Sequence, residues 1–293
     1  MRRHREQGVD AARYRLRRNL HRLEKGLAMP EQKGVFAASY IDETVTVYEK
    51  LLAAQCGGSP DGDLVWAYGV LKEYFARVGS EPSIAAAAQR FAALAHSAGV
   101  TDGKEVVKTA YRDLGKSPIA YDDLINVLRH RKAVRWYLQE PVSRELLEKA
   151  VSAAAQAPSA CNRQAFKFVI LNDKDRIRSV TNLLIGVSGF DHQIPCLILV
   201  VGDLSAYDHA RDRHLIYVDG GLAAMNFMLA ADSLGLGCCP VNWPDIPASN
   251  NALAELLDLR SDQRAVMVMA VGYPDPEGSI TLSQRRTVEQ LIC

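Results

Sequence analysis

The sequence RKAVRWY at residues 131–137, followed by APSACNRQAFKF at residues 157–168, decides how this chain folds and what it binds. The first stretch supplies cations, and the second supplies small residues and side-chain amides. Near the chain end, Arg285 and Arg286 add two more cations. Guanidinium groups suit a phosphate, and amides, which both donate and accept hydrogen bonds, suit a polyhydroxylated chain and a flat heterocycle. The two stretches and the late arginine pair predict a site for a phosphate-bearing ligand with those parts.

Composition permits a packed protein without a strong charge bias. The chain has 293 residues, 48% of them hydrophobic, and a formal net charge of +1. That charge gives no general attraction to nucleic acid or to an anionic membrane. No run approaches the roughly 18 apolar residues that a membrane span needs, and residues 1–7, MRRHREQ, lack the apolar part of a signal peptide. We therefore expect a cytoplasmic protein that neither spans a membrane nor binds nucleic acid.

The composition changes near residue 115. Before it, Ala-rich segments with apolar residues at helical spacing are separated by turn signals such as CGGSPDG at residues 56–62. They predict helices at residues 13–27, 40–54, 64–77 and 83–98. The first of these places four leucines on one face, and we expect that face to pack on the rest of the chain after residue 115 rather than on a separate protein or an anionic membrane: Leu16, Leu20, Leu23 and Leu27. The division is thus a helical extension at residues 1–115 and a second domain at residues 116–293.

The second domain mixes helical patterns with short β-branched runs. Buried strands are predicted for FKFVIL, CLILVVG and AVMVMAVGY, and GCCPVNWP is expected to continue as a strand that halts at Pro244. Gly235 is predicted to end the preceding helix in a left-handed cap. Helices are predicted at residues 121–130, 143–156, 174–184, 215–234 and 250–257. The pattern predicts an α+β fold in which helices cover a compact sheet.

Gly220 and Gly221 fall inside the helical pattern at residues 215–234, where each costs about 1 kcal/mol relative to alanine. Two explanations stay open. Either the helix packs closely against a partner subunit or a cofactor, or it begins after the glycines.

Six cysteines stand at positions 56, 161, 196, 238, 239 and 293, with no pair at the spacing of a zinc ribbon. We expect no metal and no disulfide framework, and we interpret Cys238 and Cys239 as buried packing residues. DHARDRH at residues 208–214 is interpreted as a solvated face rather than a metal site.

Four motifs, in this order, are similar to those of the FMN-dependent nitroreductase family: RKAVRWY, APSACNRQ, the Gly-rich helix leading into GLGCCPVNW, and QRRTVEQLI. The resemblance covers about residues 120–293. HRLEKGL, residues 21–27, resembles a subset of that family found among polysaccharide-biosynthesis proteins. Membership implies a nitroreductase-like sheet covered by helices, and a homodimer that binds FMN at the subunit interface.

The resemblance also assigns roles to the basic residues. It implies that Arg131 binds the FMN phosphate and that Arg135 lies near N1 and O2 of the ring, where a cation stabilises the reduced flavin. Ala133 stands where the family has serine, which removes one hydroxyl donor, and Lys132 offers a replacement cation. Arg285, with Arg286 beside it, matches the C-terminal phosphate-binding arginine.

The remaining roles concern the turn and the strand end. Pro158, Ser159 and Ala160 match the turn that meets the ribityl chain and ring from the second subunit, and the amides of Asn162 and Gln164 match groups that hydrogen-bond the cofactor. The segment facing flavin N5 through a backbone amide is Pro240, Val241, Asn242 and Trp243. Trp243 either narrows the substrate space or is an aromatic residue of the core or of an interface.

The family pattern implies an FMN-dependent oxidoreductase that transfers hydride from NAD(P)H to an organic acceptor by a ping-pong mechanism. It uses no covalent nucleophile, so no catalytic acid or base is assigned. Two alternatives stay open. One is a specialised flavin dehydrogenase of a biosynthetic intermediate, and the other is a non-catalytic flavin-binding or accessory module.

Overall fold

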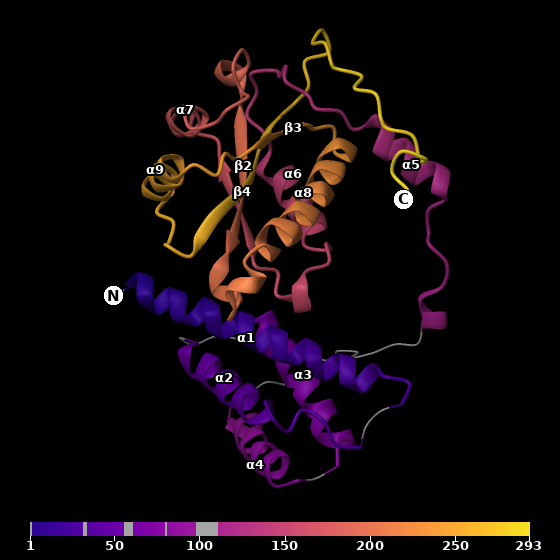
Figure 1. Cartoon of the computed structure of the whole chain (residues 1–293), viewed down its shortest axis with the longest axis vertical. Helices are drawn as coiled ribbons and strands as arrows, with labels where there is room; N and C mark the ends of the chain where they lie inside the picture. Colours follow the sequence, from indigo (N-terminus) through magenta and orange to yellow (C-terminus); the bar gives the residue numbers. More distant parts are fainter. Residues whose placement is uncertain (1, 32–33, 56–60, 80, 98–110) are drawn as a thin grey trace. The chain divides into compact units, whose positions relative to one another are not determined.

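The computed structural model describes residues 2–31, 34–55, 61–79, 81–97 and 111–293. The chain forms two compact units, each with its own core (Figure 1). We call the first the helical unit; it comprises Met1–Ser117, Ser159–Ala165 and Ser205–Arg213. We call the second the sheet unit; it comprises Pro118–Pro158, Phe166–Leu204 and His214–Cys293.

The helical unit contains the four helices predicted before residue 115. They are α1 (Arg2–Ala28), α2 (Ile41–Ala54), α3 (Gly62–Arg77) and α4 (Pro82–Ser97). The helix α1 begins well before the predicted residue 13, because the basic stretch before it continues the helix. Asp61 caps α3 by accepting a hydrogen bond from the Leu64 amide. Cys56 and the rest of residues 56–60 lie outside the described residues.

The leucine face of α1 is buried as its spacing predicts, but its partner differs from the expected one. The four leucines are completely buried in one cluster with residues of the other helices, among them Tyr48 of α2 and Leu71 and Tyr74 of α3. The expectation that this face packs on the part of the chain after residue 115 is therefore wrong. Helical spacing identifies which face is apolar, and α2 and α3, close in sequence, cover it first.

The sheet unit is built on four antiparallel strands in the order β1-β2-β4-β3. The strands are β1 (Phe166–Leu171), β2 (Cys196–Asp203), β3 (Gly237–Asn242) and β4 (Gln263–Gly272). The predicted strands are confirmed, with two corrections. The strand β1 is only partly buried, because it lies at an edge of the sheet, and β3 ends at Asn242 rather than at Pro244.

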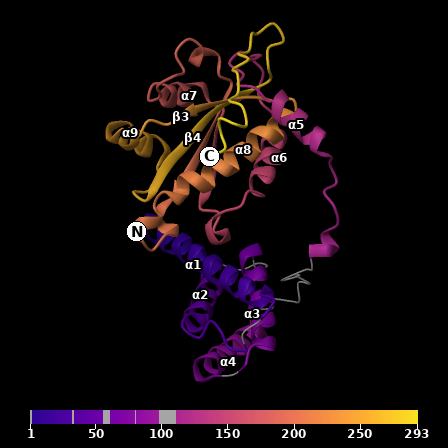
Figure 2. The same ribbon diagram turned by 45° about the vertical axis from the view of Figure 1, so that its right-hand side comes forward.

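Helices cover both faces of this sheet (Figure 2). Side chains of β2 alternate between the faces: Ile198 and Val200 belong to one core, and Leu197 and Leu199 to the other. The first core includes α6 (Arg144–Ala154) and α8 (Leu215–Ser233), and the second includes α7 (Lys174–Thr181) and α9 (Pro247–Leu257). The predicted α+β fold, a small sheet covered by helices, is confirmed.

The helix α8 packs closely against the sheet. Both of its glycines lie inside the helix, so the explanation that the helix begins after them is wrong. A β-carbon on Gly220 would lie 3.0 Å from Cγ1 of Val266 and 3.3 Å from Cγ1 of Val200, whereas one on Gly221 would meet nothing within 4 Å. Gly220 thus allows close approach to this unit's own strands. Gly235 has φ +80, which confirms the left-handed position after the helix.

Within the described residues, one helical stretch, Ala210–Ser233, is long and apolar enough to cross a membrane by length and composition alone. In the sheet unit, its Ala223, Phe227 and Ala231 are buried against the sheet. The core helix of a globular domain passes the same test, so this stretch is weak evidence for a span.

Candidate cofactor-binding site

The basic segment Arg131–Tyr137 runs beside β3. Ala133 pairs with Cys238 in a parallel bridge, and the Val134 amide donates to the Cys238 carbonyl oxygen over 3.1 Å. Gly237 makes this approach possible, because a β-carbon there would lie 2.8 Å from Cβ of Val134. Main-chain pairing and tight packing therefore fix the segment that carries the predicted phosphate-binding arginine.

Tyr137 anchors the other end of the segment. Its buried hydroxyl lies 2.5 Å from the carbonyl oxygen of Val134 and 3.1 Å from that of Ala270 on β4, and its one proton is shared between them. Burial raises the pKa of Tyr137 far above its ordinary value, so the hydroxyl remains a donor. The amide of Leu138 donates to the Tyr273 carbonyl oxygen over 2.9 Å. The segment is thus held from Ala133 to Leu138.

Arg131 and Arg135 differ in their surroundings. Nε of Arg131 is buried and has no hydrogen-bond partner. A buried donor without an acceptor is costly, and an anionic oxygen would satisfy it. The guanidinium of Arg135 lies 5.9 Å from the ring centre of Phe190, within reach of a cation–π contact. The partly buried Lys132 bonds through its ammonium group to the Arg129 carbonyl oxygen, at the end of α5 (Tyr121–His130).

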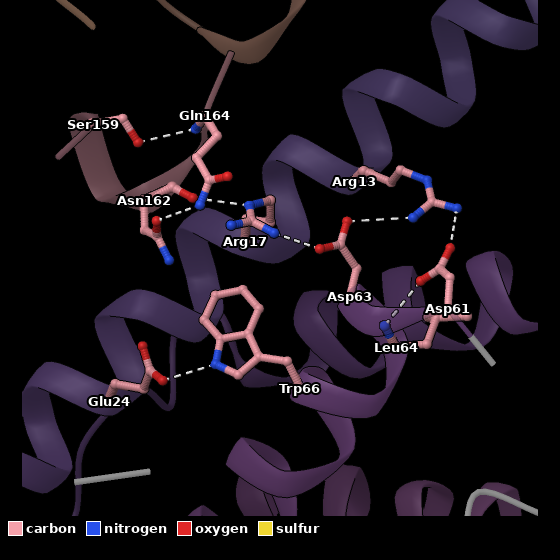
Figure 3. Close-up of polar contacts among 10 residues, drawn as sticks. All are labelled: Arg13, Arg17, Glu24, Asp61, Asp63, Leu64, Trp66, Ser159, Asn162 and Gln164. Atoms are coloured by element: carbon pink, nitrogen blue, oxygen red, sulfur yellow. Dashed lines mark hydrogen bonds and ion pairs between the residues drawn. The ribbon is translucent and has the colours of Figure 1, made fainter. Parts of the chain in front are cut away.

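The predicted turn residues Ser159, Ala160, Asn162 and Gln164 belong to the helical unit, whereas Pro158, directly before them, belongs to the sheet unit. Within the turn, the Gln164 amide nitrogen donates to Ser159 Oγ over 3.0 Å, and the Gln164 side chain donates to Asn162 Oδ1 over 2.8 Å (Figure 3). The structure therefore brings the two predicted amides together, and each keeps one polar atom for another partner.

This turn has an unusual backbone. Cys161, Asn162 and Gln164 have φ angles of 54, 51 and 51, in the left-handed region that non-glycine residues seldom adopt. Such conformations persist where the surrounding structure imposes them, and they gather at ligand-binding sites. Asparagine tolerates this region better than most residues, which accounts for Asn162, but not for its two neighbours.

The end of β3 places its four predicted residues in different environments. Val241 is buried and Asn242 is exposed, while Pro240 is partly buried. Trp243 is buried in the sheet unit's core, and its Nε1 donates to Asn250 Oδ1 over 2.7 Å. Burial together with a satisfied indole N–H favours the core alternative for Trp243 over contact with a substrate.

Arg285 and Arg286 lie on a C-terminal segment that is exposed from residue 281 to residue 293. Arg286 donates from Nη2 to the Gln290 carbonyl oxygen over 2.6 Å. Both guanidinium groups are therefore on the surface of the single chain.

Arg163 is a candidate that the sequence analysis did not single out. It is only 6% exposed, its Nε is buried without a partner, and its guanidinium lies 5.0 Å from the ring centre of Tyr207. A buried cation with an unsatisfied donor is costly, so Arg163 is a candidate ligand for an anion. In sequence, however, an arginine between two amides looks like any solvated side chain.

Cys238 and Cys239 behave as packing residues. Cys238 and Cys239 are buried, and burial raises the pKa of Cys238 to about 12. That of Cys239 is raised for the same reason. Both thiols therefore stay protonated, which confirms the packing interpretation. Among the residues that the structure describes, no group of three or more histidine, cysteine or acidic side chains lies together as metal ligands would.

Known proteins share this fold. A protein from Parabacteroides distasonis ATCC 8503, 26% identical, superposes over 57% of this chain and 95% of its own with a TM-score of 0.51. NfrA1 of B. megaterium, 21% identical, superposes over 58% of this chain and 73% of its own with a TM-score of 0.52. The sheet, its two helical layers and the basic segment along β3 define an α+β protein with a nitroreductase-like fold.

The sequence comparisons give the family. A model described as the nitroreductase family matches residues 128–187 and 182–273. The FMN reductase (NAD(P)H) of Bacillus subtilis (strain 168) is 28% identical over 168 residues, which are 52% of this chain and 66% of that protein. The iodotyrosine deiodinase of Thermotoga neapolitana is 28% identical over 176 residues, 52% of this chain and 89% of that protein. Through this part of its sequence, the chain belongs to the nitroreductase family.

Proposed function

We propose that this chain is an FMN-dependent oxidoreductase that transfers hydride between NAD(P)H and an organic acceptor, such as a nitro compound, quinone or enone, by a ping-pong mechanism. Family membership and the Bacillus FMN reductase support the enzyme class and the cofactor. The observation that carries the proposal is the buried, unpartnered Nε of Arg131, in a segment that main-chain bonds hold against β3.

The residues present fit this cofactor. The anion that would satisfy Arg131 Nε is supplied by the FMN phosphate, and Arg135 would place a second cation near the ring. The free polar atoms of Asn162 and Gln164 suit the ribityl hydroxyls and the ring edge. When bound, FMN supplies a ring that accepts a hydride from one substrate and donates it to another. The chain's own residues bind and orient it, and none is assigned as an acid or base.

We propose that the other predicted residues complete the site. Lys132 and Arg285, with Arg286, would add positive charge near the phosphate, and Pro158, Ser159 and Ala160 would approach the ribityl chain. The end of β3, from Pro240 to Trp243, would supply a backbone amide near the reactive ring atom, a role that needs no particular side chain.

We propose that the active form is a homodimer. In the single chain, α5 exposes Tyr121 and Leu124, and α8 exposes Tyr217, Val218 and Leu222. The C-terminal segment exposes five more large apolar side chains: Ile280, Leu282, Val288, Leu291 and Ile292. Apolar surface of this extent on one unit is typical of a subunit interface. We further propose a soluble, cytoplasmic dimer in which residues 1–115 form the helical extension.

The first test is the visible spectrum of the purified protein, followed by anaerobic addition of NADH or NADPH. A bound flavin whose absorbance bleaches on addition of either nucleotide is the expected result. Oxidation by a nitroaromatic, quinone or enone should then restore the absorbance. A protein that binds no FMN, even when FMN is added, would contradict the proposal. A bound flavin that neither nucleotide reduces would contradict the NAD(P)H part and favour a dehydrogenase.

A further inference from the structure

Arg17 of α1 joins two parts of the chain that are 145 residues apart. Its Nε donates a hydrogen bond to the Asn162 carbonyl oxygen over 2.8 Å (Figure 3). The side chain is only 15% exposed, and α3 holds it from the other side. Its Nη1 pairs with Asp63 Oδ1, and its guanidinium lies 5.1 Å from the ring centre of Trp66. The contacts with α3 therefore fix the orientation of the Arg17 side chain, and its Nε contacts the turn from that position.

Tyr14, one helical turn before Arg17, supports the same segment. It is buried in a small cluster with Ala165 and Ala206. Residues three apart on a helix share a face, so Tyr14 and Arg17 contact the turn together. On the neighbouring surface of α1, Arg18 pairs with Asp208 over 2.6 Å. The helix α1 thus holds both Ser159–Ala165 and Ser205–Arg213.

The turn needs this support because of its backbone. Its three left-handed residues are not glycines, so the conformation is unfavourable in isolation. The Arg17 hydrogen bond ends on the carbonyl oxygen of Asn162, the middle one of the three. A hydrogen bond from a charged donor is stronger than a neutral one, so it contributes more to holding that peptide group.

We infer that Arg17 is a positioning residue for the cofactor-binding turn. It holds Asn162, and with it the Asn162–Gln164 amide pair, in the conformation that binds FMN. The FMN part of this inference rests on the proposed function; the support of the turn does not.

The test compares Arg17→Ala with Arg13→Ala. Arg13 is a matched control, because it too pairs with Asp63, at 3.3 Å, and its other ion pair is with Asp61, which is not part of the turn. Both variants lose an ion pair to the same carboxylate. Only Arg17→Ala loses the bond to Asn162.

Two measurements decide the outcome. In the apo-protein, hydrogen exchange of the amides in residues 159–165 should accelerate in Arg17→Ala and not in Arg13→Ala. In an FMN titration followed by flavin fluorescence, Arg17→Ala should raise the Kd about tenfold, as expected for losing a hydrogen bond from a charged group. Arg17→Lys, which keeps the charge beside Asp63 but lacks Nε, should show the same two effects with less loss of stability.

Equal hydrogen-exchange rates of residues 159–165 in the two alanine variants would contradict the inference that Arg17 supports the turn. An unchanged Kd beside accelerated exchange would overturn the role in flavin binding. If the wild-type protein binds no FMN, the proposed function fails, and the exchange experiment still decides whether Arg17 holds the turn.

Discussion

Val134 occupies the space that a side chain on Gly237 would need: a β-carbon there would lie 2.8 Å from Cβ of Val134. The contact presses the arginine-bearing segment against β3. Gly237→Ala should therefore lower the free energy of unfolding by about 1–3 kcal/mol, the usual cost of overpacking, and should weaken FMN binding by displacing Arg131. Urea unfolding and an FMN titration measure the two effects.

Gly8→Ala, in α1, is the control for that substitution. Gly8 is exposed and lies on neither of the helices proposed for the subunit interface, and an added methyl group there meets nothing within 4 Å. It should leave FMN affinity unchanged and, by helix propensity, stabilise the chain by about 1 kcal/mol. Equal effects of the two alanines on FMN affinity would show that Gly237 has no bearing on the site.

Arg131→Ala should raise the Kd for FMN about 10- to 100-fold, because a hydrogen bond to a charged group contributes about 1.5–3 kcal/mol. Arg129→Ala, two residues earlier, is the matched control. Arg129 is exposed, and the bond that its carbonyl oxygen accepts from Lys132 is kept by alanine. Calorimetric titration with FMN compares them. If both variants bind FMN as tightly as the wild type, Arg131 is not the phosphate ligand.

Added FMN should also raise the thermal midpoint of the wild-type protein, because a ligand that binds only the folded state stabilises it. The rise should be smaller in Arg131→Ala than in Arg129→Ala at the same FMN concentration. Scanning calorimetry at several FMN concentrations measures this. A midpoint that does not depend on FMN concentration would count against a site in the folded protein.

Thiol alkylation should show that the buried cysteines are protected in the folded protein. Burial raises the pKa of Cys196 and Cys238 to about 12, so at pH 8 only about one molecule in 10,000 carries either thiolate. Iodoacetamide should therefore leave Cys196 and Cys238 unmodified in the native protein and modify them after unfolding, as peptide mass spectrometry would show. Modification of Cys238 in the native protein at the rate seen after unfolding would contradict the packing assignment.

His21 should make the stability of the protein sensitive to acid. Burial lowers its pKa, and the nearby charge of Lys25 lowers it further. Because the unfolded chain binds the proton more tightly, the stabilisation is present above the unfolded pKa of about 6.5 and is lost as the pH falls through the folded pKa. Thermal unfolding followed by circular dichroism should show the wild type losing more stability than His21→Gln between pH 8 and pH 5. Equal losses of stability in the wild type and in His21→Gln would show that protonation of His21 does not cause the acid sensitivity.

The sequence predicted most helices and strands, because the signals for them, the spacing of apolar residues and the turn residues, lie within each segment. The helix at Tyr121–His130 has the predicted bounds, and Gly235 adopts the predicted left-handed conformation. The same patterns failed where the answer depends on distant residues. The spacing of the leucines showed that one face of α1 is buried, but not that α2 and α3 bury it.

In the candidate site too, the sequence indicated residues in local motifs but not those that reach the site from distant parts of the chain. The motifs and the resemblance they carry predict that Arg131 and the turn at Ser159–Gln164 bind the cofactor, and this stays a prediction. They gave no sign of Arg17, because a basic residue on a helix resembles any solvated cation until the fold brings it to Asn162. Trp243 stayed ambiguous in sequence, because an indole suits a core and a substrate pocket equally well; its bond to Asn250 depends on α9.

The helical unit is not continuous in the chain, since it includes Ser159–Ala165 and Ser205–Arg213. Removing everything before Pro118 would take away the helix against which Ala165 and Ala206 are buried, and would leave both loops without their support. A chain shortened to residues 118–293 would thus present these two loops without the side chains of α1 that contact them in the full protein.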